Sequence, residues 1–176
     1  MAETVAFLTA RGIPVMGHVG LTPQTATALG GLKAQGRTAD KAIKVAEDAI
    51  GLDQAGCFAI VIEAVPEAVS EMIVRKVDAP TIGIGAGNVT AGQVLVLHDL
   101  VGFNAGHVAK FVKRYADVRG EMRSGLEKYV GEVRSGAFPA PEHVYSVDPA
   151  ELEGLRKRLN REDLDSSYSW DWEPLP

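Results

Sequence analysis

The sequence predicts an α/β protein with parallel strands, and two observations support this fold class. Four short apolar runs alternate along the 176-residue chain with amphipathic segments of helical period, which is the pattern of repeated strand–helix units. The apolar runs are nearly continuous, as is typical of parallel strands buried on both faces. We therefore expect right-handed crossovers between strands of one parallel sheet or barrel.

The first half of the chain predicts a helix at 2–11, a strand at 13–19, a helix at 38–56 and a strand at 57–65. Gly12 is a stop signal for the first helix. The second helix has apolar residues at helical spacing, and Thr38 or Asp40 can cap its beginning. The segment 21–37 is rich in Gly and Thr and predicts a loop.

The second half continues the alternation with a helix at 66–77, a strand and turn at 79–87, a strand at 92–103 and a long helix at 105–134. Pro66 suits the first turn of a helix. After Gly136 we expect a turn and then a short polar helix capped near Asp148. The final stretch, REDLDSSYSWDWEPLP, is typical of a solvated tail, although its two Trp residues could instead dock on a neighbouring protein.

Composition limits the class of protein. The formal net charge of −5 argues against nucleic acid or an anionic membrane as the main partner. The single cysteine, Cys57, lies in an apolar run, so it predicts a buried core thiol and excludes an internal disulfide. No apolar run approaches the roughly 18 residues of a membrane span, and the N-terminus lacks signal-peptide order. We expect a soluble intracellular protein.

Candidate functional residues stand where the predicted strands end. The first strand ends in the stretch Gly-His18-Val-Gly, the second at Glu63, the third in the glycine turn 83–87, and the fourth at His98 and Asp99. Function in parallel α/β folds gathers at the carboxyl ends of the strands. We therefore expect these groups to share one rim.

Glu63 is the strongest candidate, because it ends an otherwise uncharged strand. Burial disfavours the charged form of a carboxylate, which suits a general acid or base; the alternative is a Glu paired with Lys, Arg or backbone. His18 is flanked by glycines that allow a ligand to approach the backbone, or it is a structural histidine. For His98 and Asp99 we favour a structural role, because neighbours on a strand point to opposite faces.

The stretch PTIGIGAG (80–87) raises the question of a phosphate loop. It continues as GIGAGNVTAG, with Asn88 where GxGxxG needs its third Gly, and it lacks GxxxxGK[ST]. Room for a substrate is the favoured interpretation, a plain tight turn comes second, and phosphate binding comes last.

Five stretches in their order and spacing resemble the ketopantoate hydroxymethyltransferase family: GIPVMGHVGLTPQ, GGLKAQGR, AIVIEAVP, PTIGIGAG and GQVLVLHDLVGF. The resemblance runs from about Ala6 to His143. It implies a (β/α)8 TIM barrel. It also implies transfer of a hydroxymethyl group from 5,10-methylenetetrahydrofolate to 3-methyl-2-oxobutanoate, giving 2-dehydropantoate on the route to pantothenate and coenzyme A. A Mg2+ ion holds the keto acid in that family.

Residue by residue, the resemblance makes Glu63 the acid/base group and His18 a substrate-pocket histidine. Ile84, Val94 and Val96 correspond to apolar walls around the side chain of the keto acid. PTIGIGAG then becomes a barrel strand with Ile84 in the pocket and glycines that turn the chain. Ala91, where the family usually has Asp, departs from the pattern in a loop.

The resemblance covers only the C-terminal half of a barrel of roughly 250 residues, so we expect a partial barrel of about four parallel strands plus C-terminal helices. Residues 1–143 would form the family-like part and 144–176 an extension. The family's metal ligands belong to the other half, so none is assigned in this chain. Open strand edges favour association, so we expect a homo-oligomer or a complementing N-terminal half.

Two other interpretations stay open from the sequence. The chain could be a catalytically incomplete half-barrel that only assembles or regulates, or a keto-acid lyase of the phosphoenolpyruvate mutase type. The family resemblance predicts a mitochondrial location in a eukaryote and a cytoplasmic one in a bacterium.

Overall fold

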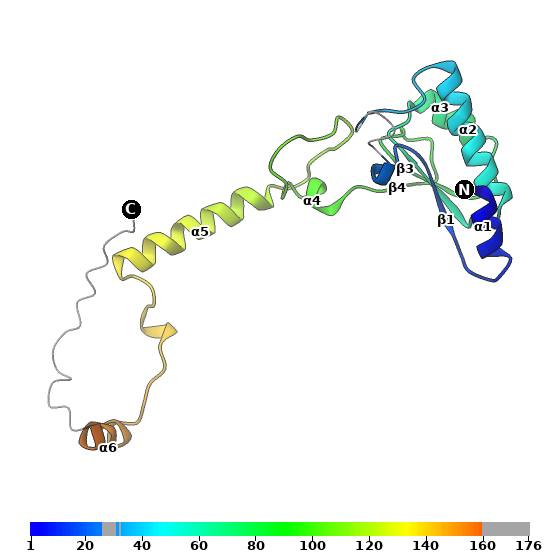
Figure 1. The fold of residues 1–176 in the computed structure, drawn as a ribbon. Coiled ribbons are helices and arrows are strands. Elements are labelled where there is room, and N and C mark those ends of the chain that lie inside the picture. Colours follow the sequence, from blue (N-terminus) through cyan, green and yellow to red (C-terminus); the bar gives the residue numbers. More distant parts are fainter. Residues whose placement is uncertain (26–30, 32, 160–176) are drawn as a thin grey trace. The chain divides into compact units, whose positions relative to one another are not determined.

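The computed structural model describes residues 1–25, 31 and 33–159. By its internal contacts the chain divides into two compact units, Met1–Val118 and Arg119–Pro176. The first unit contains the sheet (Figure 1) and all the candidate site residues.

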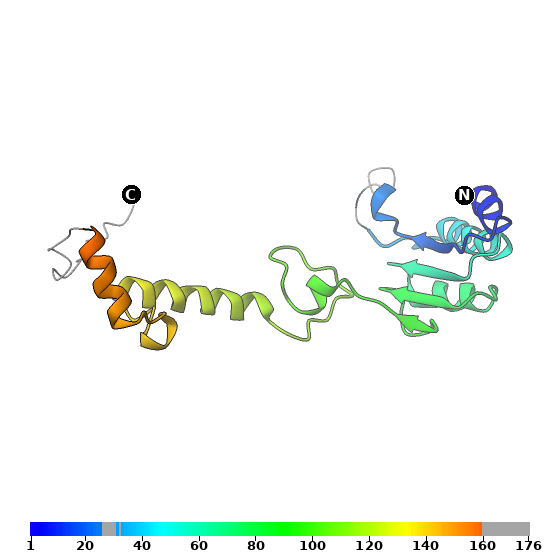
Figure 2. The same ribbon diagram turned by 90° about the horizontal axis from the view of Figure 1, so that it is seen from below.

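The first unit is built on one four-stranded parallel sheet whose strands lie side by side in chain order (Figure 2). The strands are β1 (Met16–Gly20), β2 (Ala59–Glu63), β3 (Thr81–Ile84) and β4 (Gly92–Gln93). Each neighbouring pair is parallel. This confirms the predicted α/β class, and four parallel strands with helices are consistent with a partial TIM barrel.

Helix α1 (Ala2–Thr9) precedes β1, whereas α2 (Ala39–Gln54) connects β1 to β2 and α3 (Glu67–Val74) connects β2 to β3. Of the two residues predicted to cap α2, Thr38 is the N-cap, and its hydroxyl accepts a hydrogen bond from the backbone N–H of Lys41 at 3.4 Å. An N-cap of this kind satisfies one of the free N–H groups of the first turn. A short 3-10 turn, η1 (Pro23–Thr25), follows β1.

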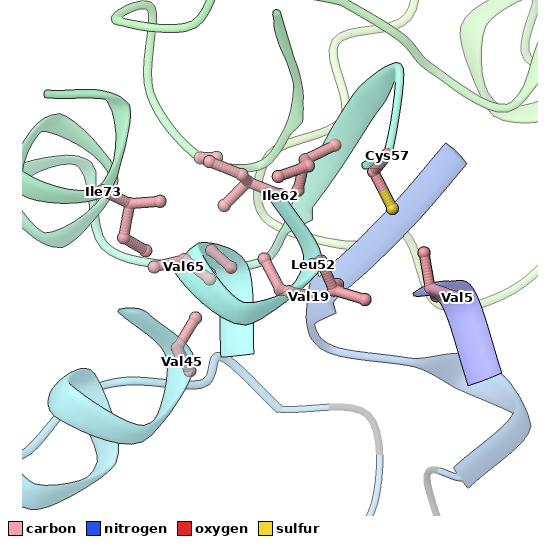
Figure 3. Close-up of a cluster of buried hydrophobic side chains, with 11 residues drawn as sticks. Val5, Val19, Val45, Leu52, Cys57, Ile62, Val65 and Ile73 are labelled. Carbon is pink, nitrogen blue, oxygen red and sulfur yellow. The ribbon is translucent and has the colours of Figure 1, made fainter. Parts of the chain in front are cut away.

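The core lies between these helices and one face of the sheet (Figure 3). Its members are buried apolar side chains from α1, β1, α2, β2 and α3, from the segment before β2, and from the segments that follow β2 and β3: Val5, Val19, Val45, Ala49, Leu52, Cys57, Ile60, Ile62, Val65, Ile73 and Ala86. Burying one such Ile or Val side chain stabilises a fold by roughly 1.5–3 kcal/mol. The packing of α2 and α3 on the sheet therefore determines which strand side chains point away from the core.

The prediction of a strand over 92–103 is correct only for its first residues and wrong for the rest. Ladder pairing of β4 ends at Gln93, with one further hydrogen bond from Val94 N–H to the Gly83 carbonyl at 3.0 Å. The chain then forms a short helix, α4 (Leu97–Leu100). A short apolar run does not by itself distinguish a strand from a helix, and here the backbone N–H groups of Asp99 and Leu100 both bond to the Val96 carbonyl.

The helix predicted at 105–134 begins later than expected. Helix α5 spans Val118–Ser135, and the preceding residues 103–117 form a loop. Its end is tied back by hydrogen bonds from Tyr115 N–H to the Leu100 carbonyl, at 2.8 Å, and from Val118 N–H to the Val101 carbonyl, at 3.0 Å. These contacts override the local helical pattern.

The second unit contains most of α5, a 3-10 turn η2 (Pro141–His143) and α6 (Pro149–Leu159). The Phe138 ring bridges the rings of Tyr129 and His143, with centroids 5.5 and 5.1 Å away. Asp148 accepts the Ala150 N–H at 2.8 Å, which confirms the predicted cap of the short helix. The two Trp residues of the tail lie outside the described residues, and the domain boundary expected at 143/144 stays a prediction.

Among the residues that the structure describes, none of the helices has the length and apolar character needed to cross a membrane.

Replacing a core isoleucine tests the packing of α3. Ile73 is fully buried, whereas Ile43 on α2 is 56% exposed. We expect Ile73→Ala to lower the free energy of unfolding by roughly 2–5 kcal/mol through lost burial and a cavity. The same exchange at Ile43 should change it by less than about 0.5 kcal/mol. Urea unfolding of both variants measures the difference, and equal effects would contradict this core.

Cys57 is a buried core residue, as predicted. Its burial, and secondly the nearby Asp53 carboxylate, raise the pKa of the Cys57 thiol above its usual value of 9.0. The unfolded chain therefore loses the thiol proton at a lower pH than the folded chain. The stabilisation from this shift is complete below pH 9.0 and is lost as the pH rises through the higher folded value.

We expect the wild-type chain to lose stability relative to Cys57→Ala as the pH is raised from 8 to above 9, and native Cys57 to react slowly with a thiol reagent at neutral pH. Thermal unfolding of both chains across this pH range measures the first effect. If the difference in stability between the two chains did not change with pH, the thiol would have the same pKa in the folded and unfolded chains.

Candidate active site

The carboxyl ends of the first three strands form one rim. Gly20, Glu63 and Ile84 are aligned across β1, β2 and β3 by the strand register. Two further backbone bonds extend the alignment, from Leu21 N–H to the Glu63 carbonyl and from Ala64 N–H to the Ile84 carbonyl, both at 2.8 Å. The backbone around Glu63 is therefore held from both sides.

Glu63 points to the face of the sheet opposite the core. Ile60 and Ile62 of β2 are fully buried in the core, and successive strand side chains alternate between faces. Val61 and Glu63 therefore face the other way. His18 is in register with Val61, so it shares the face of Glu63.

The two polar groups predicted to share a rim are in contact. Nε2 of His18 lies 3.0 Å from Oε2 of Glu63, and the side chains are 31% and 15% exposed. Nε2 is itself buried, and its geometry toward the carboxylate is not that of an aligned hydrogen bond. The pair is thus within ion-pair distance, and in the described part of the chain Glu63 pairs with His18 and not with Lys or Arg.

A left-handed residue follows Glu63 directly. Ala64 has a φ of 51°, which costs a non-glycine residue roughly 1–2 kcal/mol. Its carbonyl accepts the Gln35 N–H at 2.8 Å, and its own N–H bonds to Ile84. These bonds hold an unfavourable backbone conformation beside the site, a feature often found where function requires a fixed geometry.

The glycines around His18 make room for protein atoms. A Cβ on Gly20, where φ is +90°, would overlap the Glu63 carbonyl oxygen, and one on Gly17 would lie 3.1 Å from Leu52 Cδ1. Gly20 thus allows the end of β1 to approach the Glu63 backbone closely. From the sequence we expected a ligand to use this space, but in the structure other protein atoms occupy it.

The glycine run 83–87 is the end of β3 followed by a turn, as predicted. Ile84 closes the strand and is only 8% exposed. Gly85 and Gly87 then have positive φ values of 66° and 78°. The Phe111 ring fills the space beside Gly85, and the Glu67 side chain that beside Gly87.

The remaining predicted residues lie after β4. Val94 and Val96 are 44% and 52% exposed. The His98 ring packs on Phe103 with centroids 5.2 Å apart, while Asp99 accepts a hydrogen bond from the Asn104 side chain at 2.7 Å. Each of the two polar residues thus has its own local partner, in agreement with the structural role favoured from sequence.

Sequence reasoning missed Phe111. The predicted helix at 105–134 placed it on a helix face, whereas it lies in the loop after α4 and packs on Gly85. The only signal in the sequence was an aromatic residue among basic neighbours, Lys110, Lys113 and Arg114, and that signal is weak.

The described residues contain no cluster of three or more His, Cys, Asp or Glu side chains that could hold a metal ion. Mg2+ needs an octahedral set of oxygen ligands, of which proteins usually supply one or two carboxylates. Glu63, which is already in contact with His18, does not form such a set with other side chains described here.

Comparison with known proteins identifies the class of protein. A sequence model of the ketopantoate hydroxymethyltransferase family matches residues 1–141. The chain belongs to this family, a group of hydroxymethyltransferases. This confirms the resemblance found in the sequence.

Individual relatives agree with the family match. A protein from Nitratidesulfovibrio vulgaris (strain DP4) is 47% identical over 85% of this chain and 49% of its own length. Proteins from Heliobacterium modesticaldum and Paracoccus denitrificans are 52% and 53% identical, over 88% and 82% of this chain and 56% and 52% of theirs. All three are named 3-methyl-2-oxobutanoate hydroxymethyltransferase. The chain spans about half the length of these curated relatives.

Substituting Gly20 tests the close approach at the rim. Gly12 also has a positive φ, but a Cβ there would meet nothing within 4 Å. Gly12→Ala should therefore cost only the backbone strain of about 1–2 kcal/mol. Gly20→Ala should cost roughly 1–3 kcal/mol more, because its methyl group overlaps the Glu63 carbonyl. Urea unfolding measures both, and equal costs would exclude the close approach.

Proposed function

We propose that this chain contributes Glu63 and His18 to an active site that transfers a hydroxymethyl group from 5,10-methylenetetrahydrofolate to 3-methyl-2-oxobutanoate, giving 2-dehydropantoate. The main support is the contact of 3.0 Å between His18 Nε2 and Glu63 Oε2 at the carboxyl rim of the sheet. The names of the relatives favour this transferase over an assembly module or a phosphoenolpyruvate mutase-like lyase.

Glu63 has the chemistry that the first step needs. The C3–H bond of the keto acid lies next to a ketone, so a base can remove this proton and leave an enolate. The Glu63 carboxylate takes the proton, and the enolate carbon then forms the new bond to the one-carbon unit. In the complete transfer both C–N bonds that hold the one-carbon unit to the folate break. One water supplies the hydroxyl group and a proton to one folate nitrogen, the proton taken from C3 goes to the other, and tetrahydrofolate is released.

His18 contacts Glu63 and completes the polar side of the site. Its ring lies on the same face as Glu63 and is about one-third exposed, so it can contact both the carboxylate and a bound keto acid. Contacts between catalytic groups in an unliganded site are often poorly aligned and tighten when substrate binds. The unaligned geometry of the pair agrees with this behaviour.

Apolar side chains next to Glu63 suit the branched end of the keto acid. Ile84 is in register with Glu63 on the neighbouring strand. Val94 continues the pairing beyond β4 through its bond to the Gly83 carbonyl, and Val94 and Val96 are both exposed. We assign these three residues to the walls around the isopropyl group.

The remaining assignments rest on the family. Mg2+, when bound, would stabilise the negative charge that develops on the keto-acid oxygens, and the described residues offer no ligand set for it.

We propose an intracellular protein that works as a homo-oligomer or with a complementing half-barrel. The support is the short β4 edge and the exposed apolar Val94 and Val96 beside it.

Hydrogen–deuterium exchange at C3 of 3-methyl-2-oxobutanoate tests the proposed function. The chain is added in D2O with Mg2+, and proton NMR follows the C3 signal. We expect exchange with the wild-type chain and a rate about 10^2–10^4-fold lower with Glu63→Gln, the usual contribution of a general base.

Glu71→Gln is the matched control, because Glu71 is an exposed glutamate on α3 that pairs with Arg75. It should exchange at the wild-type rate. Wild-type exchange in Glu63→Gln would remove Glu63 from the base role. No exchange by the folded wild-type chain would overturn the proposed activity for this chain.

A further inference from the structure

The loop after α4 closes on itself beside the rim of the sheet. The two ends of the loop 103–117 lie close together, because Tyr115 N–H bonds to the Leu100 carbonyl and Val118 N–H bonds to the Val101 carbonyl. Loops of this length whose ends meet are compact and are frequently functional. The loop and α4 together connect β4 to α5, and the segments that follow the strands build the active sites of parallel α/β folds.

One aromatic residue joins this loop to the end of β3. Phe111 is half-buried, whereas its basic neighbours are exposed: Lys110, Lys113 and Arg114. A Cβ on Gly85 would overlap Cδ1 of the Phe111 ring. The ring therefore rests directly on the Gly85 backbone, in space that any other residue at 85 would occupy.

This position puts Phe111 at the carboxyl end of β3, next to the strand that carries the proposed base. Gly85 immediately follows Ile84, and Ile84 is in register with Glu63 on the neighbouring strand. Neighbouring strands lie roughly 4.8 Å apart. The ring thus packs on Gly85, the residue that directly follows the register partner of Glu63 on the neighbouring strand. Ile84 is 8% exposed, against 44% for Val94, so the rim is enclosed near the ring and more open toward β4.

From these contacts we propose that Phe111 determines substrate specificity, its ring forming an apolar wall against the branched side chain of the keto acid. The inference rests on the proposed function of Glu63. An aromatic ring offers a large apolar surface and no group to bind the keto-acid carboxylate. It orients the branched end toward itself, limits its length, and keeps water from that side of Glu63.

Two substitutions at different positions remove this wall. Phe111→Leu shortens the side chain, and Gly85→Ala adds a methyl group where the ring now packs. Phe103→Leu is the matched control, because Phe103 lies at the start of the same loop but packs on His98. Circular dichroism and thermal melts establish that each variant is folded.

The measurement is C3 exchange in D2O with two keto acids, 3-methyl-2-oxobutanoate and the longer 4-methyl-2-oxopentanoate. One methylene group in an apolar pocket changes discrimination by roughly 10–200-fold. We expect the ratio of the exchange rate with the longer keto acid to the exchange rate with the shorter one to rise at least about 10-fold in Phe111→Leu. It should rise in the same direction in Gly85→Ala and stay unchanged in Phe103→Leu.

A binding measurement keeps the test independent of turnover and of the stability of the variants. The wild-type chain is prepared with protonated Phe in a deuterated background, and transferred NOEs from Phe ring protons to the methyl groups of 3-methyl-2-oxobutanoate are recorded. We expect NOEs that persist in Phe103→Leu and disappear in Phe111→Leu. Wild-type binding without any such NOE overturns the inference even if Phe111→Leu does not fold.

The outcomes separate the two proposals. Wild-type exchange with an unchanged substrate ratio in folded Phe111→Leu overturns the role of Phe111 and leaves Glu63 as the base. No exchange by the wild-type chain overturns the proposed activity for this chain, while the NOE experiment still decides whether Phe111 contacts the keto acid.

Discussion

The burial of Ile60 and Ile62 against α2 and α3 is the constraint on which the site depends. Side chains on a strand alternate between faces, so fixing these two isoleucines in the core turns Glu63 to the opposite face. The parallel register with β1 puts His18 on the same face, and the two polar groups meet at 3.0 Å. The hydrophobic core thus sets the geometry of a polar pair that is not part of it.

Backbone contacts then hold this geometry at the strand ends. Gly20 lets the end of β1 approach the Glu63 carbonyl, and the left-handed Ala64 is bonded to both Ile84 and Gln35. A site fixed by several backbone bonds loses little freedom when substrate binds. This agrees with the general observation that strained residues persist where the surrounding structure over-determines them.

Much of this arrangement could be predicted from the sequence. Buried strands, the cap at Thr38, the core position of Cys57 and the shared rim of His18 and Glu63 follow from local patterns and from parallel topology. The segment after β4 could not be predicted, because an apolar run does not distinguish a strand from a helix. The bonds that tie Tyr115 and Val118 back toward α4 are tertiary, so neither the late start of α5 nor the position of Phe111 has a local signal.

A double-mutant cycle on Glu63 and His18 tests the central claim most directly, which is that the two side chains act as one unit. C3 exchange of 3-methyl-2-oxobutanoate is measured for Glu63→Gln, His18→Gln and the double variant. Residues that act together show non-additive losses, so the double variant should exchange no more slowly than Glu63→Gln alone. Losses that multiply would show that the two groups act independently and would contradict this account.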